Sequence, residues 1–270
     1  MSDKVFKTFR QQLSILRSRG MNIKSGSQSS RAIRILEREN YYSVINGYKE
    51  PFIASKNPDL YQTGTEFDEL YALFTFDRNI RSIYLKYILK AEHHIKTVLA
   101  HEFSHKYGHD NYMKLSNFDT STKQKLASVS KLLKKVQDEI AQNMNKSKEI
   151  THYMNQYGYI PLWVLTNVLT IGELSYFYSA LYQQDMNAVS RFFNILPFEL
   201  EKYLKVLTLA RNLCAHDERF YDSHFRTGIS PTKVKKFRLY SGFSGRTGLQ
   251  LLILAFLQLS KSSLRSLHRY

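Results

Sequence analysis

The sequence contains very little cysteine, no apolar core of a signal peptide in its first residues, and no apolar stretch long enough to cross a membrane. Cys214 is its one cysteine, which excludes an intramolecular disulfide framework and favours a reducing compartment. The first residues, MSDKVFKTFRQQL, are charged and amphipathic, unlike the continuous apolar core of a signal peptide. The longest apolar stretch, Leu249 to Leu259, is far shorter than the roughly 20 residues that cross a bilayer. We therefore expect a soluble, cytoplasmic protein with no membrane partner.

Proline is also scarce, with five residues in 270, and acidic residues are outnumbered by basic ones. Few helix breakers together with 14% aromatic residues indicate helices that pack through large rings. The 39 Lys and Arg against 23 Asp and Glu give a net charge of +16 and a pI near 9.7. This excess favours a polyanionic partner, most commonly nucleic acid, although a basic surface that only keeps the protein soluble remains an alternative.

Apolar residues recur at helical spacing along most of the chain, and no alternating strand pattern persists. The fold class is therefore all-α. Segment 120–148 is Lys-rich and weakly hydrophobic, which is typical of a solvated arm. Loops are expected at 21–30, 51–64 and 241–248, and helices over 4–19, 33–46, 65–105 and 120–148 and from Pro161, Gly172, Pro197 and Leu249 onward. We predict an N-terminal helical extension over 1–64 and a helical domain over 65–270.

The segment ARNLCAHDERF (210–220) ends the apolar helix that follows Pro197. Asn212 and His216 are four residues apart and share one helical face, and the long side chain of Arg211 reaches the same region. Metal-free RNA cleavage needs a base for the 2′-hydroxyl, an acid for the leaving 5′-oxygen and positive charge at the phosphate. Histidine suits the proton transfers, arginine binds phosphate through two donors, and Asn212 would orient the histidine or the substrate.

On the pattern alone, a structural role is the more common explanation for so short a motif. Arg211 would then pair with Asp217 or Glu218, and His216 would be a satisfied core residue. Cys214 lies between the two candidate residues and is better explained as small apolar filler than as a nucleophile.

The wider sequence resembles a known family. The R-N-x-x-x-H motif is similar to that of HEPN-superfamily ribonucleases, and the chain from roughly residue 4 to residue 222 resembles the Abi family of abortive-infection proteins (AbiD/AbiF type). The stretches that carry this resemblance occur in the family's order. They are KTFRQQLSILRSRGM (7–21), NYYSVINGYKEPF (40–52), TEFDELYALFTFDRNIRSIYLKYILKAEHHIKTVLAHEFSHKYG (65–108), PLWVLTNVLTIGELSYFYSAL (161–181) and LARNLCAHDERFYD (209–222).

The resemblance implies a helical HEPN fold over 65–270, homodimerisation and a composite cleft between two copies of the motif. Arg211 and His216 would be the catalytic residues and Asn212 their polar helper. The implied activity is toxin-like RNA cleavage in phage defence or a toxin–antitoxin pair, with no cofactor and with a non-coding antitoxin RNA as the neutralising partner. HEPN domains also include inactive, RNA-binding members, and a toxin that acts on a protein partner is a third alternative.

A competing motif is His101-Glu102-Phe103-Ser104-His105, which matches the H-E-x-x-H pattern of zinc metalloproteases. Two histidines one turn apart could bind zinc, with Glu102 as the base and His109 as a third ligand. Gly108 is expected to end the helix before His109, and the segment also fits the end of a structural helix. We therefore disfavour zinc proteolysis.

Basic residues outside the motif are candidate RNA contacts. Those on the long helix could line a groove, although most are equally explained as a solvated face, and Glu92-Lys96 is most simply a surface ion pair. The lysines of segment 120–148 are spaced to follow a phosphate backbone. The candidates are Arg78, Arg81, Lys90, His93, Lys96, Lys131, Lys134 and Lys135.

Overall fold

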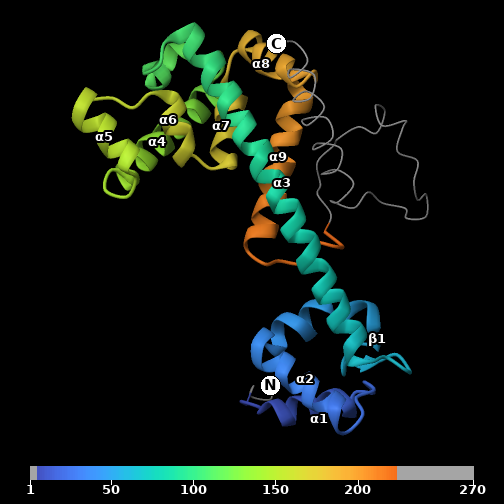
Figure 1. Cartoon of the computed structure of the whole chain (residues 1–270). Coiled ribbons are helices and arrows are strands. Elements are labelled where there is room, and N and C mark those ends of the chain that lie inside the picture. Colours follow the sequence, from blue (N-terminus) through green and yellow to red (C-terminus); the bar gives the residue numbers. More distant parts are fainter. Residues whose placement is uncertain (1–4, 224–270) are drawn as a thin grey trace, which may run out of the picture. The chain divides into compact units, whose positions relative to one another are not determined.

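The computed structural model of the chain describes residues 5–223. It divides into two compact units, Met1–Ser82 and Ile83–Tyr270, and the long helix α3 (Phe67–Tyr107) contributes to both. Figure 1 follows the elements along the chain. We predicted a boundary at residue 64, just before α3, whereas the units divide within this helix.

The first unit is built on two short helices, α1 (Phe9–Ser18) and α2 (Ser27–Glu39), which pack against each other. Thr8 and Gln11 form a capping box at the start of α1, each side chain accepting a hydrogen bond from the other's backbone N–H. After α2 come a π-helical turn (Tyr42–Asn46), a 3-10 turn (Glu50–Phe52) and an antiparallel hairpin of β1 (Ile53–Ser55) and β2 (Leu60–Tyr61). The core of this unit includes Leu13, Leu16, Ile35, Leu36, Val44, Ile45, Leu70 and Phe74.

Three polar side chains are buried together in the first unit, and we refer to them as the Arg81 cluster. The Tyr48 hydroxyl donates a hydrogen bond to Asp77 at 2.6 Å, and the Arg81 guanidinium donates to both residues, at 2.9 Å to the hydroxyl and 2.5 Å to the carboxylate. Asp77 is 0% exposed and Arg81 is 3% exposed. Burial, and then the hydrogen bond to Asp77, raises the pKa of the Tyr48 hydroxyl. These contacts tie the segment after α2 to α3.

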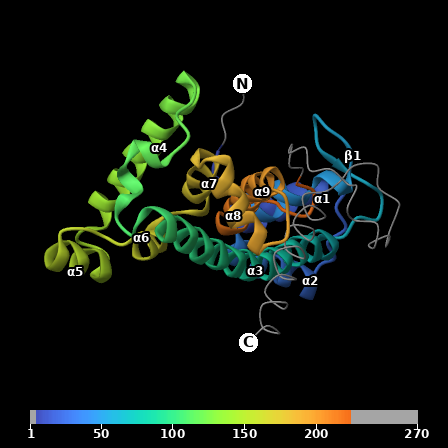
Figure 2. The ribbon, with the colours of Figure 1, turned by 90° about the horizontal axis from the view of Figure 1, so that it is seen from above.

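The second unit contains the remainder of α3 and the helices that follow it. Phe103, Phe118 and Phe177 form its aromatic centre, with ring centroids 5.2–5.6 Å apart. Helix α7 packs against both α4 and α9, and α8 packs against α9; Figure 2 shows α4, α5 and α6 grouped on one side of α7. The elements are 3-10 turns at Asn111–Met113 and Leu115–Asn117, α4 (Lys123–Asn143), α5 (Lys148–Tyr157), α6 (Leu162–Val168), α7 (Ile171–Ala180), α8 (Gln183–Phe192) and α9 (Pro197–Ala215).

The prediction of an all-α fold is confirmed, and the β1–β2 hairpin is the single sheet within residues 5–223. Two local predictions were wrong. Helix α2 begins at Ser27, inside the expected loop 21–30, because hydrogen bonds from Lys24 to Gln28 and from Arg17 to Ser29 hold its first turn. Helix α4 is not a solvated arm, because it buries the stripe Val129, Leu132, Val136 and Ile140 and packs against α7.

The prediction of helices was incomplete, and two predicted segments cannot be compared with the structure. Helices α5 and α8 were not predicted. The expected loop 241–248 and the helix from Leu249 lie outside the described residues. Among residues 5–223, no helix combines the length and the apolar character needed to cross a bilayer.

Candidate active site at the end of α9

Helix α9 is a well-anchored support for the motif at its end. Pro197 occupies the first turn, where a missing N–H costs nothing, and the Glu199 carboxylate accepts a hydrogen bond from the N–H of Leu196 at 3.0 Å. Gly172 of α7 allows a close approach to this helix, because a Cβ there would lie 3.3 Å from the Thr208 methyl group. The buried face of α9 consists of Leu200, Tyr203, Leu204, Val206, Leu207, Ala210 and Cys214.

The chain turns sharply directly after the motif. His216 caps α9, and its N–H donates to the Asn212 carbonyl at 2.9 Å. Asp217 adopts a left-handed backbone with φ of 58°, and the N–H of Glu218 returns to the Leu213 carbonyl at 3.1 Å. This is the hydrogen bond of a Schellman ending, with an aspartate where glycine is usual. It fixes His216 at the exposed end of the helix.

The three motif side chains are available to a ligand. Arg211 is half-buried, whereas Asn212 and His216 are exposed. Within residues 5–223, none of these three side chains forms a hydrogen bond or an ion pair. The structural alternative considered from the sequence, an Arg211 ion pair and a core His216, is therefore not what the structure contains.

Two aromatic residues that the sequence analysis did not single out support the end of α9. The Tyr84 ring of α3 packs against Phe220, with centroids 5.1 Å apart, and Phe220 is fully buried. Burial, and then the nearby Cys214 thiol, raises the pKa of Tyr84 to about 12. The thiol faces the protein interior at 9% exposure, in agreement with its expected role as filler. No short-range pattern signals this contact, because Tyr84 and Phe220 are far apart in the sequence.

Two of the predicted RNA contacts, Arg78 and Arg81, lie in the first unit. The prediction for Arg81 was wrong, because its guanidinium is buried and already bonded to Asp77 and Tyr48. Arg78 is partly exposed, but it forms a bidentate pair with Glu39 at 3.0 and 2.5 Å, which lowers the pKa of that carboxyl. The Arg78 charge is therefore largely neutralised by Glu39.

The candidates on the second part of α3 differ from one another. Lys90 and His93 are exposed, and the Lys90 ammonium lies 5.8 Å from the centroid of the Tyr87 ring. Lys96 pairs with Glu92 at 2.9 Å, and the two side chains are only 13% and 11% exposed. The expected surface ion pair is thus mostly buried, because this turn of α3 faces the core. Lys90 and His93 remain candidate RNA contacts.

The candidates on α4 are all exposed. Neither Lys131 nor Lys134 forms an ion pair in the described part of the chain, and the Lys135 ammonium lies 3.5 Å from the Glu173 carboxylate. A pair at this distance with the lysine 57% exposed is weak. The role of these lysines in RNA binding stays a prediction.

The H-E-x-x-H segment does not assemble the ligands of a zinc site. The His101 and His105 rings are stacked with centroids 6.2 Å apart, and His101 is hydrogen-bonded to Glu102 at 2.9 Å. Gly108 ends α3, and His109 contacts Tyr159 instead. In the region that the structure describes, no group of three His, Cys, Asp or Glu side chains is placed to hold a metal ion.

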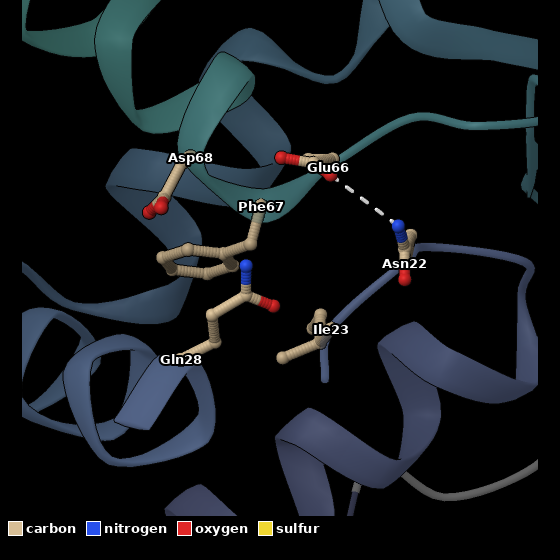
Figure 3. A pocket seen from close by; sticks show the side chains of 6 residues that line it. All are labelled: Asn22, Ile23, Gln28, Glu66, Phe67 and Asp68. Atoms are coloured by element: carbon tan, nitrogen blue, oxygen red, sulfur yellow. Dashed lines mark hydrogen bonds between the residues drawn. The ribbon is translucent and has the colours of Figure 1, made fainter. Parts of the chain in front are cut away.

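Two hollows elsewhere on the chain have no motif residue in their walls. The first, in the first unit, measures about 10 Å³, room for one water; Figure 3 shows the Asn22 amide donating to Glu66 at 3.4 Å beside Phe67 and Gln28. The second is an open depression of about 430 Å³ between α8 and α9, lined by residues from Asn187 to Pro197.

Comparison with known protein families identifies the family of the chain. A sequence model of the family described as Abi-like protein matches residues 34–222, which is well over half of the chain and includes α3 and the motif. No curated protein and no solved structure matches the chain significantly.

Proposed function

The chain belongs to the Abi-like protein family, and from this membership we propose that it is a metal-independent endoribonuclease of the HEPN type. Its biological role would be that of a toxin in abortive infection, the phage-defence process with which the family is associated. RNA is then both the substrate and, as a non-coding antitoxin, the neutralising partner. The net charge of +16 supports a polyanionic ligand.

The observation that carries this proposal is the set of unpartnered side chains at the end of α9. Arg211, Asn212 and His216 lie at the end of an apolar, well-packed helix, and their side chains make no hydrogen bond or ion pair with any described residue. A stable fold does not require them there, since exposed polar groups without partners add little to stability. Preorganised donors on a rigid support are what binding and catalysis do require.

The proposed chemistry is a transesterification. A histidine removes the proton from the ribose 2′-hydroxyl, and the 2′-oxygen forms a bond to phosphorus as the bond to the 5′-oxygen breaks. A second group donates a proton to the leaving 5′-oxygen, and Arg211 stabilises the charge on the phosphate oxygens. The products are a 2′,3′-cyclic phosphate and a 5′-hydroxyl end.

Two copies of the motif suit this reaction better than one. A single His216 cannot easily act on opposite sides of a phosphodiester, whereas a two-fold axis supplies two histidines and two arginines. Leu209 is 45% exposed and lies on the same stripe of α9 as Asn212 and His216, at spacings of three and four residues. An exposed apolar residue beside the motif favours a homodimer in which the two α9 ends meet.

The first test is expression of the wild-type chain beside Arg211→Ala and His216→Ala, with total RNA extracted and its ends mapped. We expect growth arrest and 5′-hydroxyl fragments from the wild type alone, and resistance of the activity to EDTA. His101→Ala is the matched control, because it removes an exposed histidine from the H-E-x-x-H segment. Intact RNA in all cultures would contradict the proposal and leave a binding protein.

The composite site has its own test. A mixed dimer of a wild-type copy and an Arg211→Ala/His216→Ala copy keeps half of the wild-type rate if each copy acts alone. We expect less than about a tenth, because general acid–base catalysis contributes roughly 10²–10⁴-fold and one of its two groups is missing. Differently tagged copies, co-expressed and purified through both tags, provide the mixed dimer.

A further inference from the structure

Six aromatic side chains form a continuous series of ring contacts in the second unit, distinct from the motif. Four contacts run from Trp163 to His109 (6.2 Å between centroids), then to Tyr159 (4.9 Å), Tyr157 (6.1 Å) and Tyr153 (5.5 Å). His152 contacts both Tyr153 and Tyr157, at 5.5 and 6.1 Å. We call these six residues the aromatic series. They come from α5, from α6 and from the segments that precede α6 and follow α3.

The aromatic series lies at the surface rather than in the core. Trp163 is 51% exposed and Tyr157 is 54% exposed, and both histidines are exposed as well. In residues 5–223, none of the hydroxyl and ring nitrogen atoms of the six side chains makes a hydrogen bond. Two buried tyrosines differ in this respect, because the Tyr112 and Tyr178 hydroxyls both donate to backbone carbonyls. The rings therefore present faces and polar edges that the fold does not use.

The backbone beneath the aromatic series is held firmly. Gly158 ends α5 with a left-handed φ of 74°, and its N–H donates to the Met154 carbonyl. The Tyr112 hydroxyl donates to the Ile160 carbonyl at 2.9 Å, and the N–H of Leu162 donates to the His109 carbonyl at 2.9 Å. Ring positions fixed in this way lose little freedom when a flat ligand stacks on them.

Positive charge accompanies the aromatic series. Helix α4 packs against α5 and α6, and all three lie together on the side of α7 away from α9 (Figures 1 and 2). The exposed lysines of α4, Lys131, Lys134 and Lys135, therefore belong to the same group of helices as the rings. Exposed rings and exposed lysines on one group of packed helices match a ligand with flat bases and an anionic backbone.

We propose that the aromatic series is a stacking platform for the unpaired bases of single-stranded RNA, apart from the cleavage motif. Bases in a duplex are covered by their neighbours, whereas unpaired bases can stack on aromatic rings irrespective of sequence. This proposal depends on the function proposed above in one respect, which is that the ligand is RNA. The platform would hold an unpaired segment of the substrate or of the antitoxin RNA while α4 contacts phosphates.

Trp163 gives a direct readout, because it is the single tryptophan of the chain. The full-length His216→Ala protein, which binds without cutting, is titrated with oligo(A) RNA and with the same strand annealed to its complement. We expect the single strand to quench Trp163 fluorescence and the duplex to have little effect. Equal quenching by both forms, or none by the single strand, overturns the proposal.

Variants measure the contribution of the rings to affinity. Tyr157→Ala and Trp163→Ala, each in the His216→Ala background, are expected to weaken oligo(A) binding by at least about fivefold, the low end for loss of one stacked base. Tyr176→Ala is the matched control, because Tyr176 is 62% exposed on α7 and lies outside the aromatic series. Fluorescence anisotropy of a labelled oligonucleotide gives the affinities, and circular dichroism confirms folding.

The outcomes separate this inference from the proposed ribonuclease. Unchanged affinity in both ring variants overturns the platform, even if the wild type cleaves RNA and His216→Ala does not. Reduced affinity in the ring variants upholds the platform, even if the wild type leaves RNA intact. If the ring variants instead change the sedimentation of the protein without altering RNA affinity, the aromatic series is a protein interface and the inference is wrong.

Discussion

Two arginine-containing clusters, one in each unit, use the same side chain in opposite ways. Arg81 is 3% exposed and is bonded to Asp77 and Tyr48, so its charge has partners inside the protein. Arg211 is half-buried, its neighbours Asn212 and His216 are exposed, and none of the three side chains is bonded to another described residue. The first cluster is part of the fold, and the second is available to a ligand.

The difference follows from what each environment demands. A buried charge without partners is very costly, and Asp77 and Tyr48 are among the partners that make the burial of Arg81 possible. An exposed side chain is solvated by water and needs no partner to be tolerated. Because stability does not explain the polar residues at the end of α9, we attribute them to function. The comparison predicts that substitutions in the two clusters affect different properties.

The largest expected effect on stability comes from Asp77→Ala. This change removes the carboxylate that pairs with the buried Arg81 guanidinium, and loss of one partner of a buried ion pair typically costs about 3–5 kcal/mol. Urea denaturation followed by circular dichroism measures the free energy of unfolding. The control is Asp77→Leu combined with Arg81→Met, which removes both charges together and is expected to recover most of the loss. Equal instability of the single and double variants would contradict the assignment.

Arg211→Ala is expected to reduce activity and leave stability nearly unchanged. RNA cleavage falls about 10²–10³-fold, because a donor to the developing charge is lost, while the free energy of unfolding stays within about 0.5 kcal/mol of the wild type. Initial cleavage rates and denaturation curves on the same preparations test both parts. Arg211→Lys keeps the charge without the two-pronged geometry and should retain intermediate activity. If Arg211→Ala lost activity because it unfolded, Arg211 would have a structural role, and the distinction between the two clusters would be wrong.

Tyr48→Phe tests the smaller contribution of the hydroxyl to the Arg81 cluster. It removes one bond to each charged partner and is expected to destabilise the protein by about 1–3 kcal/mol. Since the folded state raises the pKa of Tyr48, it favours the neutral hydroxyl, and this stability is lost as pH rises above the ordinary tyrosine value of about 10. The free energy of unfolding, measured at several pH values from 8 to 11, should decrease less steeply with pH for the variant than for the wild type. The difference in slope should correspond to about one proton released on unfolding. Identical slopes would show that Tyr48 does not titrate differently in the two states.

Sequence reasoning located the elements whose apolar spacing is long and regular. Helices α3 and α9 were predicted because their buried residues recur every three or four positions and because Pro197 marks a helix start. Helix α5 was missed because Ile150 is its one buried residue among the described side chains, too little for a periodic pattern. The buried face of α4 was underestimated because its lysines obscure a narrow apolar stripe on a helix that packs against α5, α6 and α7.

Functional residues, too, could be predicted from the sequence only where they lie close together along the chain. Arg211, Asn212 and His216 were recognisable because they lie within six consecutive positions. The burial of Arg81 depends on Tyr48, 33 residues away, and the support from Tyr84 and Phe220 joins segments still further apart. The aromatic series likewise forms only when the segment after α3 meets α5 and α6. Contacts between distant segments decide which charged or aromatic residues remain exposed, and a single sequence does not specify them.

The smallest expected effect concerns the backbone that holds His216. Asp217 has a φ of 58°, a conformation that glycine adopts without strain, so Asp217→Gly should be more stable than Asp217→Ala by about 1 kcal/mol. Both variants lack the carboxylate, and their difference therefore isolates the backbone term, which thermal denaturation can resolve. We expect the two to cleave RNA at similar rates, because both keep the turn that exposes His216. If Asp217→Gly were as stable as Asp217→Ala but markedly less active, the strained turn would itself contribute to positioning His216. The end of α9 would then have a structural role as well as a functional one, unlike the Arg81 cluster, whose role is structural.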